Sequence, residues 1–278
     1  MIYHNFSPIV FEIFGLKIRW YGIAWSFGFL LTYLILKKYH KFAKISNSDK
    51  VEEYVIILIL FLLITTKIFV ILHDLFLGVS IDLDYFKGLI FSGFSAIGSF
   101  IGVILGIIYL KRVKKENFDL VSLLGLILIG LIISSSIGRI ANFLNKEFYG
   151  IKSNAWFCVV FFENDYCRIP VQIFESIYYL FLSIVLILFL HKINKNSEKS
   201  DQYKWTLLDI GLYGYGIGRF MIEFLKEMPK VFFSLNTTQI EIFFILFIYT
   251  LLKIFQFKKT KKIKGENIEK TKTKRKQK

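Results

Sequence analysis

Long apolar runs dominate the chain from about residue 20 to residue 257. Uncharged stretches such as residues 91–110 and 121–137 can each cross a bilayer as a helix, which takes roughly 17–25 residues. Hydrocarbon offers no water to a free backbone amide or carbonyl, so runs of this kind must be helical. The sequence does not show the period-two alternation of an outer-membrane barrel. The pattern therefore predicts an all-α integral membrane protein.

The apolar runs predict a bundle of about seven transmembrane helices. Residues 1–19 lack the basic start, the short apolar core and the small-residue cleavage site of a signal peptide, so the first helix should remain in the mature protein. Lys67 interrupts the second run, and ionisable residues also interrupt the fifth and sixth, where they are costly unless paired or used. The expected spans are residues 20–37, 54–76, 91–110, 119–138, 171–190, 205–225 and 238–257.

The distribution of basic residues predicts the topology. Thirteen lysines and arginines lie between the expected spans on one side, nine lie over longer loops on the other, and eleven more follow residue 257. Because basic residues are enriched on the cytoplasmic side, the amino terminus should lie outside and the carboxyl terminus inside.

Two parts are expected: a seven-span domain at residues 1–257 and a basic tail at residues 258–278. The tail has almost nothing to bury, so it should be disordered and held near anionic headgroups in the cytoplasm. The net charge of +15 could suggest nucleic acid, but the tail has no aromatic residue for stacking on bases. We therefore expect no nucleic-acid partner.

Two cysteines, Cys158 and Cys167, fall in an expected outward loop. An oxidising compartment would permit a disulfide between them, and two unpaired thiols are the alternative. The four histidines have no metal-ligand spacing, and no glycine-rich loop follows a strand. The sequence therefore predicts no metal ion and no cofactor.

Small residues mark two of the expected helices. Gly98, Gly102 and Gly106 recur at intervals of four in the third span and predict close helix packing. The sixth span carries Arg219 and Glu223 four residues apart, on one helical face. A buried ion pair that holds this helix to a neighbour is one interpretation. Several glycines just before Arg219 favour a polar site, because they let a lipid headgroup or another backbone approach.

A second polar cluster follows the fourth span. Residues 138–150 read G-R-I-A-N-F-L-N-K-E-F-Y-G, which places Arg139, Asn142 and Glu147 near the outer interface. A guanidinium can fork onto a phosphate, and an amide can orient a hydroxyl group. Tyr21, near the start of the first span, adds a phenol at the same interface.

The stretch at residues 138–150 resembles the signature of the prolipoprotein diacylglyceryl transferases, G-R-x-x-N-F-x-N-x-E-x-x-G. The resemblance extends over about residues 15–255 and implies a multi-pass enzyme of the bacterial cell (inner) membrane, with its active site toward the outer face. The other matching residues are Trp20, Tyr21 and Gly22 in the first span, Arg168, Pro170, Gln172 and Glu175 around the start of the fifth, and Tyr215, Arg219 and Glu223 in the sixth.

The resemblance also implies a reaction. The diacylglyceryl group of phosphatidylglycerol would pass to the lipobox cysteine thiol of a prolipoprotein, forming a thioether and releasing glycerol 1-phosphate, as the first step of lipoprotein maturation. The expected partners are phosphatidylglycerol, prolipoprotein signal peptides with a lipobox cysteine, and membrane lipids. The implied catalytic residues are Tyr21, Glu147, Arg219 and Glu223. The residues implied to bind phosphatidylglycerol are Arg139, Asn142, Gly150 and Tyr215.

The chain departs from the family pattern in three places. Ile97, Gly98 and Ser99 stand where the family usually has His-Gly-Gly or Tyr-Gly-Gly. Ile169 stands in place of a histidine before the proline, and Thr65, Thr66 and Lys67 stand in place of Gly-x-Arg. An isoleucine at position 97 cannot take a proton from the substrate thiol, whose thiolate is the nucleophile.

Two hypotheses follow from the missing histidine. In the first, the enzyme is active, and the proton passes to Tyr21, Glu147 or Glu223, or needs no dedicated protein base. In the second, the protein binds lipid with impaired catalysis. The first is favoured because a general base typically contributes 10²- to 10⁴-fold, which positioning and charge stabilisation can exceed. A small transporter is a further alternative, but no pair of spans repeats in the sequence.

Overall fold

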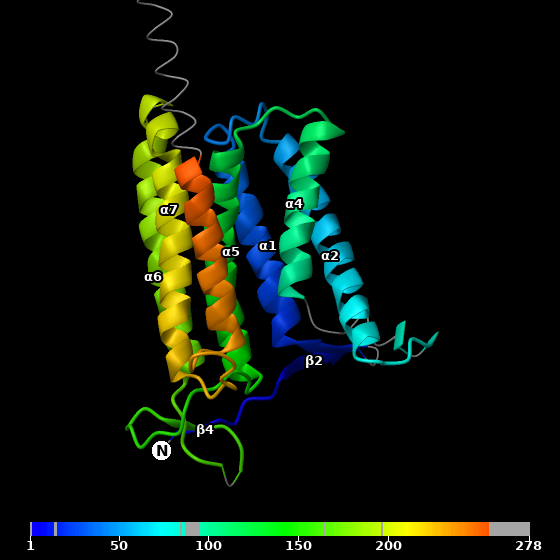
Figure 1. Cartoon of the computed structure of the whole chain (residues 1–278), viewed down its shortest axis with the longest axis vertical. Helices are drawn as coiled ribbons and strands as arrows, with labels where there is room; N and C mark the ends of the chain where they lie inside the picture. Colours follow the sequence, from blue (N-terminus) through cyan, green and yellow to red (C-terminus); the bar gives the residue numbers. More distant parts are fainter. Residues whose placement is uncertain are drawn as a thin grey trace, which may run out of the picture. The chain divides into compact units, whose positions relative to one another are not determined.

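A computed structural model of the chain describes residues 2–13, 16–83, 85–86, 95–163, 165–195 and 197–255. Long helices make up most of this part of the chain (Figure 1). The tail expected at residues 258–278 and the first residues of the expected third span lie outside the described residues. The helices are α1 (Trp20–Lys38), α2 (Lys50–Phe76), α4 (Ala96–Arg112), α5 (Leu120–Leu144), α6 (Val171–Asn194), α7 (Ser197–Ile222), the 3₁₀ turn η1 (Glu223–Leu225) and the helix Thr237–Phe255.

Each expected span overlaps one of these helices, so the helical interpretation of the apolar runs is confirmed. The helix ends differ from the span ends. Helix α5 continues past residue 138 to Leu144, and α7 begins at Ser197 although its apolar run starts near residue 205. The apolar pattern predicts where hydrocarbon begins and ends, whereas a helix with satisfied backbone bonds can continue into water.

Within the part of the chain that the structure describes, four helices are long and apolar enough to cross a membrane: α2, α5, α6 and the helix Thr237–Phe255. Large apolar side chains stay exposed on their surfaces, among them Ile64 on α2, Phe181 on α6 and Leu252 on the last helix. Exposed apolar helix faces suit contact with lipid. The protein is thus mostly helical, with several helices suited to a membrane.

The chain divides into two compact units. One comprises Phe27–Leu131 and Leu188–Leu208, and in it the glycine stripe of α4 packs on α2. A Cβ added at Gly98 would lie 2.8 Å from the Thr65 carbonyl oxygen, and one at Gly102 would lie 2.6 Å from the Cα of Leu62. The predicted packing role of the stripe is therefore confirmed.

Thr65, Thr66 and Ser99, from two of the segments that depart from the pattern of the resembled family, take part in the same contact. The Thr65 hydroxyl donates to the Gly98 carbonyl at 2.7 Å, and the Thr66 and Ser99 hydroxyls lie 2.8 Å apart. Hydroxyls that bond within a helix pair satisfy their own polarity in an apolar setting. These substituted residues therefore stabilise the α2–α4 contact.

The other unit comprises Met1–Ser26, Ile132–Ile187 and Asp209–Lys278. In it the glycines of α7 admit side chains of neighbouring helices. The Tyr178 hydroxyl of α6 donates to the Gly214 carbonyl at 2.6 Å, and a Cβ added at Gly216 would lie 2.9 Å from Leu246. The close approach expected at these glycines is thus made by the protein's own side chains.

Short strands, which the sequence pattern did not predict, lie before α1 and between α5 and α6. Strand β2 (Ile9–Ile13) pairs antiparallel with β3 (Leu16–Arg19), and β1 (Ile2–Tyr3) pairs parallel with β4 (Val159–Val160). Segments of two to five residues are too short to show a reliable period of two. The all-α interpretation therefore holds for the helices and missed these strands.

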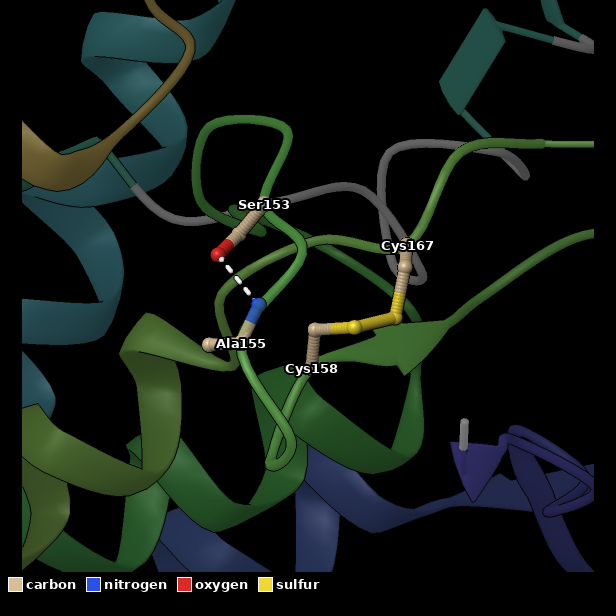
Figure 2. The surroundings of a disulfide bond; sticks show 4 residues. All are labelled: Ser153, Ala155, Cys158 and Cys167. Atoms are coloured by element: carbon tan, nitrogen blue, oxygen red, sulfur yellow. Dashed lines mark hydrogen bonds between the residues drawn. A yellow bond between two sulfur atoms is a disulfide. The ribbon is translucent and has the colours of Figure 1, made fainter.

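A disulfide joins Cys158 and Cys167, which settles the alternative left open by the sequence (Figure 2). It closes the loop between these two cysteines, and just before this loop the Ala155 amide donates to the Ser153 hydroxyl oxygen at 3.1 Å. Backbone bonds also link Val159 and Arg168 in both directions, each at 2.9 Å. The disulfide and these bonds give the loop a fixed shape beyond the helix ends.

Candidate functional site

The candidate site begins where α5 ends. Lys146 adopts a positive φ of 59°, its amide donates to the Phe143 carbonyl at 3.0 Å, and the Glu147 amide donates to the Asn142 carbonyl at 2.9 Å. These two bonds with a left-handed residue form a Schellman motif, which ends a helix and turns the chain back. The Gln172 side chain also donates to the Glu147 carbonyl at 2.6 Å. The turn therefore fixes the backbone of Glu147 beside the last turn of α5.

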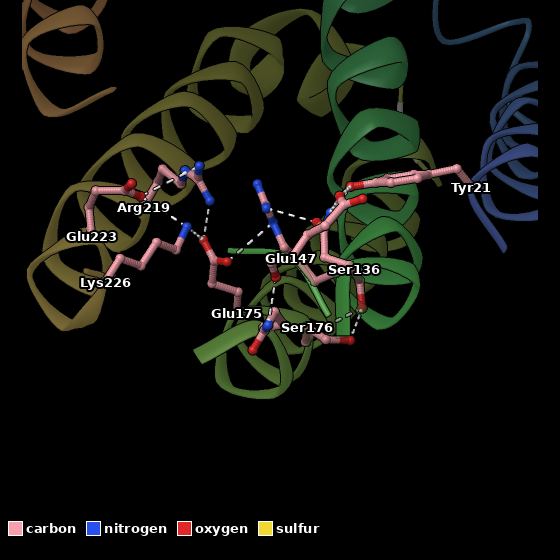
Figure 3. A network of polar contacts seen from close by, with 11 residues as sticks. Tyr21, Ser136, Glu147, Glu175, Ser176, Arg219, Glu223 and Lys226 are labelled. Atoms are coloured by element: carbon pink, nitrogen blue, oxygen red, sulfur yellow. Dashed lines mark hydrogen bonds and ion pairs between the residues drawn. The ribbon is translucent and has the colours of Figure 1, made fainter. Parts of the chain in front are cut away.

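Tyr21 and Glu147 meet at this turn (Figure 3), and Asn142 contacts both of them. The Tyr21 hydroxyl donates to Oε2 of Glu147 at 2.6 Å, and the Asn142 amide group donates to the Tyr21 oxygen. Arg139, one turn earlier on α5, donates from Nη1 to Oδ1 of Asn142 at 2.9 Å. A tyrosine far away in the sequence is thus held against the Arg139–Asn142–Glu147 cluster.

A buried carboxylate connects this group to the second cluster. Glu175, on the first turns of α6, is fully buried, and its Oε2 lies 3.3 Å from Nε of Arg139. Its other oxygen accepts from Arg219 of α7 and from Nζ of Lys226, the latter at 3.0 Å. Glu175 therefore holds both arginines at the same end of the unit.

The 3₁₀ turn after α7 completes the network. Glu223 is 1% exposed, and its Oε2 lies 3.5 Å from Arg219 and 3.0 Å from Nζ of Lys226. The Asn236 amide reaches the other oxygen of Glu223 at 3.4 Å. The ion pair between Arg219 and Glu223 that their spacing suggested is present, as part of a larger cluster.

The charges of the second cluster do not cancel. Among the residues joined by ion pairs, Arg139, Arg219 and Lys226 are three cations and Glu175 and Glu223 are two carboxylates, which leaves one positive charge in this cluster. The third carboxylate of the site, Glu147, contacts Tyr21 and Asn142 instead. Buried charge is costly unless it is paired. A ligand with a single negative charge, such as a phosphodiester, would balance this cluster, and guanidinium groups suit its oxygens.

Two of the expected residues lie outside these hydrogen bonds. The Tyr215 ring stacks on Tyr179, with ring centroids 5.0 Å apart, four residues before Arg219. Gly150 lies where three backbones come together: an added Cβ would be 2.6 Å from the Ile169 carbonyl oxygen and 2.8 Å from that of Leu225. In this structure Gly150 therefore has a packing role.

Sequence reasoning did not assign site roles to Glu175, Gln172 or Lys226. Glu175 interrupts an apolar helix and lies in the matched part of α6, and Lys226 lies three residues after Glu223. A buried carboxylate inside a membrane helix needs a cation as its partner. Arg219 and Lys226, two cations close together in the sequence, were therefore the available signal that Glu175 belongs to the site. Within the described residues, no group of three or more His, Cys, Asp or Glu side chains could hold a metal ion.

Apolar helices and a polar site whose ion-paired cluster has one more cation than carboxylates define a membrane protein suited to bind an anionic group. A family model described as prolipoprotein diacylglyceryl transferase matches residues 8–255. The chain belongs to the prolipoprotein diacylglyceryl transferase family.

Curated relatives match along most of their length. The phosphatidylglycerol–prolipoprotein diacylglyceryl transferase of Campylobacter hominis is 30% identical over 239 residues, which cover 81% of this chain and 81% of the relative. The protein of the same name from Clostridium tetani is 29% identical over 260 residues, 91% of this chain and 99% of the relative. That from Ehrlichia ruminantium strain Welgevonden is 28% identical over 231 residues, 80% and 84% of the two chains.

Proposed function

We propose that this protein transfers the diacylglyceryl group of phosphatidylglycerol to prolipoproteins. Its family and the names of its relatives support this activity. The observation that carries it to this chain is the net-cationic cluster in which Glu175 holds Arg139 and Arg219 together. A phosphatidylglycerol phosphate that binds there brings the single negative charge that the cluster lacks.

In the proposed reaction, the thiol sulfur of the lipobox cysteine attacks the carbon of the diacylglyceryl group that is bonded to the phosphate oxygen. The new carbon–sulfur bond is a thioether, the carbon–oxygen bond to the phosphate breaks, and glycerol 1-phosphate leaves with the electron pair. Arg139 and Arg219 stabilise the charge that develops on the phosphate, in a site with little competing water. The thiol proton must pass to an acceptor, since the thiolate is the nucleophile.

Glu147 is the proton acceptor that the geometry supports best. Glu223 is 1% exposed, and its oxygens already face Arg219, Lys226 and Asn236. Glu147 is only partly buried, and Tyr21 donates to one of its oxygens at 2.6 Å. Tyr21 thus orients the carboxylate, and Glu147 can take the proton that Ile97 cannot.

We further propose the topology that the basic residues predict. The seven helices of residues 1–257 would cross the bacterial inner membrane with the amino terminus outside and the carboxyl terminus in the cytoplasm. The candidate site would then face outward, toward the side on which the prolipoprotein cysteine is presented. The tail at residues 258–278 would remain near the anionic headgroups of the cytoplasmic leaflet.

Transfer of labelled diacylglycerol from phosphatidylglycerol to a lipobox peptide tests the proposal. Wild type should label the peptide thiol, and Glu147→Gln should lower the rate by roughly 10²- to 10⁴-fold, the usual contribution of a general base. Glu53→Gln is the matched control, because Glu53 is half-exposed and pairs with Lys114 in the other unit.

A wild-type protein that binds phosphatidylglycerol but labels no peptide would support the alternative of a lipid-binding relative with impaired catalysis. Normal turnover by Glu147→Gln would instead remove Glu147 as the proton acceptor and leave the transferase activity in place.

A further inference from the structure

A pocket of about 910 Å³ lies beside the candidate site, in the same unit. Its walls come from the N-terminal segment at residues 3–5, from Lys146 after α5, and from the segment between α5 and α6 that contains the disulfide. The lining residues of that segment are 152–154, 160–163 and 165–167. Lys146 directly precedes Glu147, whose carboxylate accepts from Tyr21. The pocket therefore starts one residue from the proposed proton acceptor.

The pocket is bordered by β1, whose second edge pairs with no strand in the described residues. The amides of Ile2 and His4 donate to the carbonyls of Cys158 and Val160, at 3.4 and 3.0 Å. Alternate residues of a strand face opposite neighbours, so the amide and carbonyl of Tyr3 face away from β4. Among the strands in the described part of the chain, β1 pairs with β4 alone. An exposed edge of this kind can accept a further extended polypeptide.

Two cations of the pocket have no carboxylate partner in the described residues. Nζ of Lys152 lies 3.6 Å from the centre of the Tyr166 ring, and Nζ of Lys146 lies 5.6 Å from that of Phe162. Two carboxylates also line the pocket: that of Asp165 is engaged by Arg168, with an N–O distance of 2.9 Å, and that of Glu163 forms no ion pair with either lysine among the described residues. Aromatic faces hold both ammonium groups and leave them able to bind a carboxylate of a ligand.

Size and setting favour a peptide over a lipid headgroup. Pockets that hold a whole small molecule measure roughly 300–1,000 Å³, and this pocket is near the upper end of that range. It is built from strand and loop residues outside the long helices, whereas the paired arginines lie on α5 and α7. Backbone groups at a free strand edge recognise a polypeptide.

We propose that this pocket binds, in extended form and through its acidic side chains, the segment of the prolipoprotein that directly follows the modified cysteine. The inference rests on the proposed function, because a signal peptide in the membrane leaves the residues after its cysteine on the outer side. An extended chain advances about 3.3 Å per residue, so only a few residues separate a cysteine near Glu147 from the pocket wall at Lys146. The pocket would then set which prolipoproteins are modified efficiently.

Two lipobox peptides test this inference in the labelled-transfer assay. They share the signal segment and the cysteine; one ends there, and the other continues for about eight residues with two aspartates. Wild type should show kcat/KM roughly tenfold higher for the long peptide, mainly through KM, a size that a few ion pairs and edge hydrogen bonds can supply. Lys146→Glu and Lys152→Glu should bring this ratio toward one.

A charge exchange and a control make the test specific. A long peptide with lysines in place of the aspartates should be preferred by Lys152→Glu over the acidic one. Lys230→Glu is the matched control, since Lys230 is exposed and outside the pocket, and it should keep the wild-type ratio. Lys146→Gln and Lys152→Gln serve as milder variants, with membrane-inserted protein quantified for each.

Equal kcat/KM for long and short peptides in wild type would overturn the inference and leave the transferase in place. The inference would also be overturned if the lysine variants kept the wild-type ratio of kcat/KM between the two peptides and raised the KM for phosphatidylglycerol. The pocket would then bind a lipid headgroup. Absence of transfer to either peptide would overturn the proposed function, and this inference with it.

Discussion

Glu175→Gln removes the negative charge that holds three cations together. The side chain is fully buried, and its oxygens face Arg139, Arg219 and Lys226. The amide keeps the shape of the carboxylate, so the change isolates charge from volume. The cluster would go from one surplus positive charge to two, in a setting where little water can screen them.

Removing one partner of a buried ion pair costs roughly 3–5 kcal/mol, because the remaining charge stays buried without compensation. At roughly 2–3 °C per kcal/mol for a chain of this size, the thermal midpoint in detergent should fall by roughly 6–15 °C. Glu53→Gln breaks a half-exposed pair with Lys114 and should leave the midpoint unchanged.

The lipid itself provides the sharper readout. Phosphatidylglycerol supplies a negative charge to the cluster, so it should raise the midpoint of Glu175→Gln more than that of wild type. A neutral lipid with the same acyl chains should not distinguish the two proteins. Unfolding of Glu175→Gln at the wild-type midpoint, with the same response to both lipids, would refute the view that Glu175 organises the site.

Two further changes test the backbone and the N-terminal segment. Gly150→Ala places a Cβ 2.6 Å from the Ile169 carbonyl oxygen, so it should lower stability by roughly 1–3 kcal/mol and slow transfer through misplacement of the loop; an unchanged thermal midpoint would contradict this packing role. His4 lies against the rings of Phe143 and Phe161, and burial lowers the pKa of its imidazole below the usual 6.5. The unfolded chain therefore binds the proton more readily, so wild type should lose protection of residues 2–13 as the pH falls below about 6.5. Limited proteolysis between about pH 8 and 5 would measure this loss, and His4→Phe should be much less sensitive to acid; equal sensitivity would place the cause elsewhere.

The sequence predicted the parts of the fold that depend on local pattern. Apolar runs predicted each helix, and the stretch at residues 138–150 predicted that Arg139 and Asn142 lie in one polar cluster. The spacing of Arg219 and Glu223 likewise predicted their ion pair. In each case the contact is made within one helix or at its end, so periodicity alone is sufficient to find it.

Contacts between distant segments could not be found in this way. Glu175 meets Arg139 and Arg219 only because α6 packs with α5 and α7, and no spacing along the chain encodes that meeting. The pairing of β1 with β4 joins two separate pieces of this unit's sequence, more than 150 residues apart, and each strand has only two residues. The close contacts of Gly150 with residues 169 and 225 are likewise tertiary, and its expected role in lipid binding stays a prediction.

The most direct test of the account compares the products formed by wild type and by Arg139→Ala. Purified protein is incubated with phosphatidylglycerol and a lipobox peptide, and the mass of the peptide and the released phosphate ester are both measured. Wild type should add one diacylglyceryl group at the cysteine and release an equal amount of glycerol 1-phosphate, and Arg139→Ala should do neither while remaining inserted in the membrane. Equal amounts of product from the two proteins would contradict the role of Arg139 in binding the phosphate. No product from wild type would contradict the proposed transferase activity.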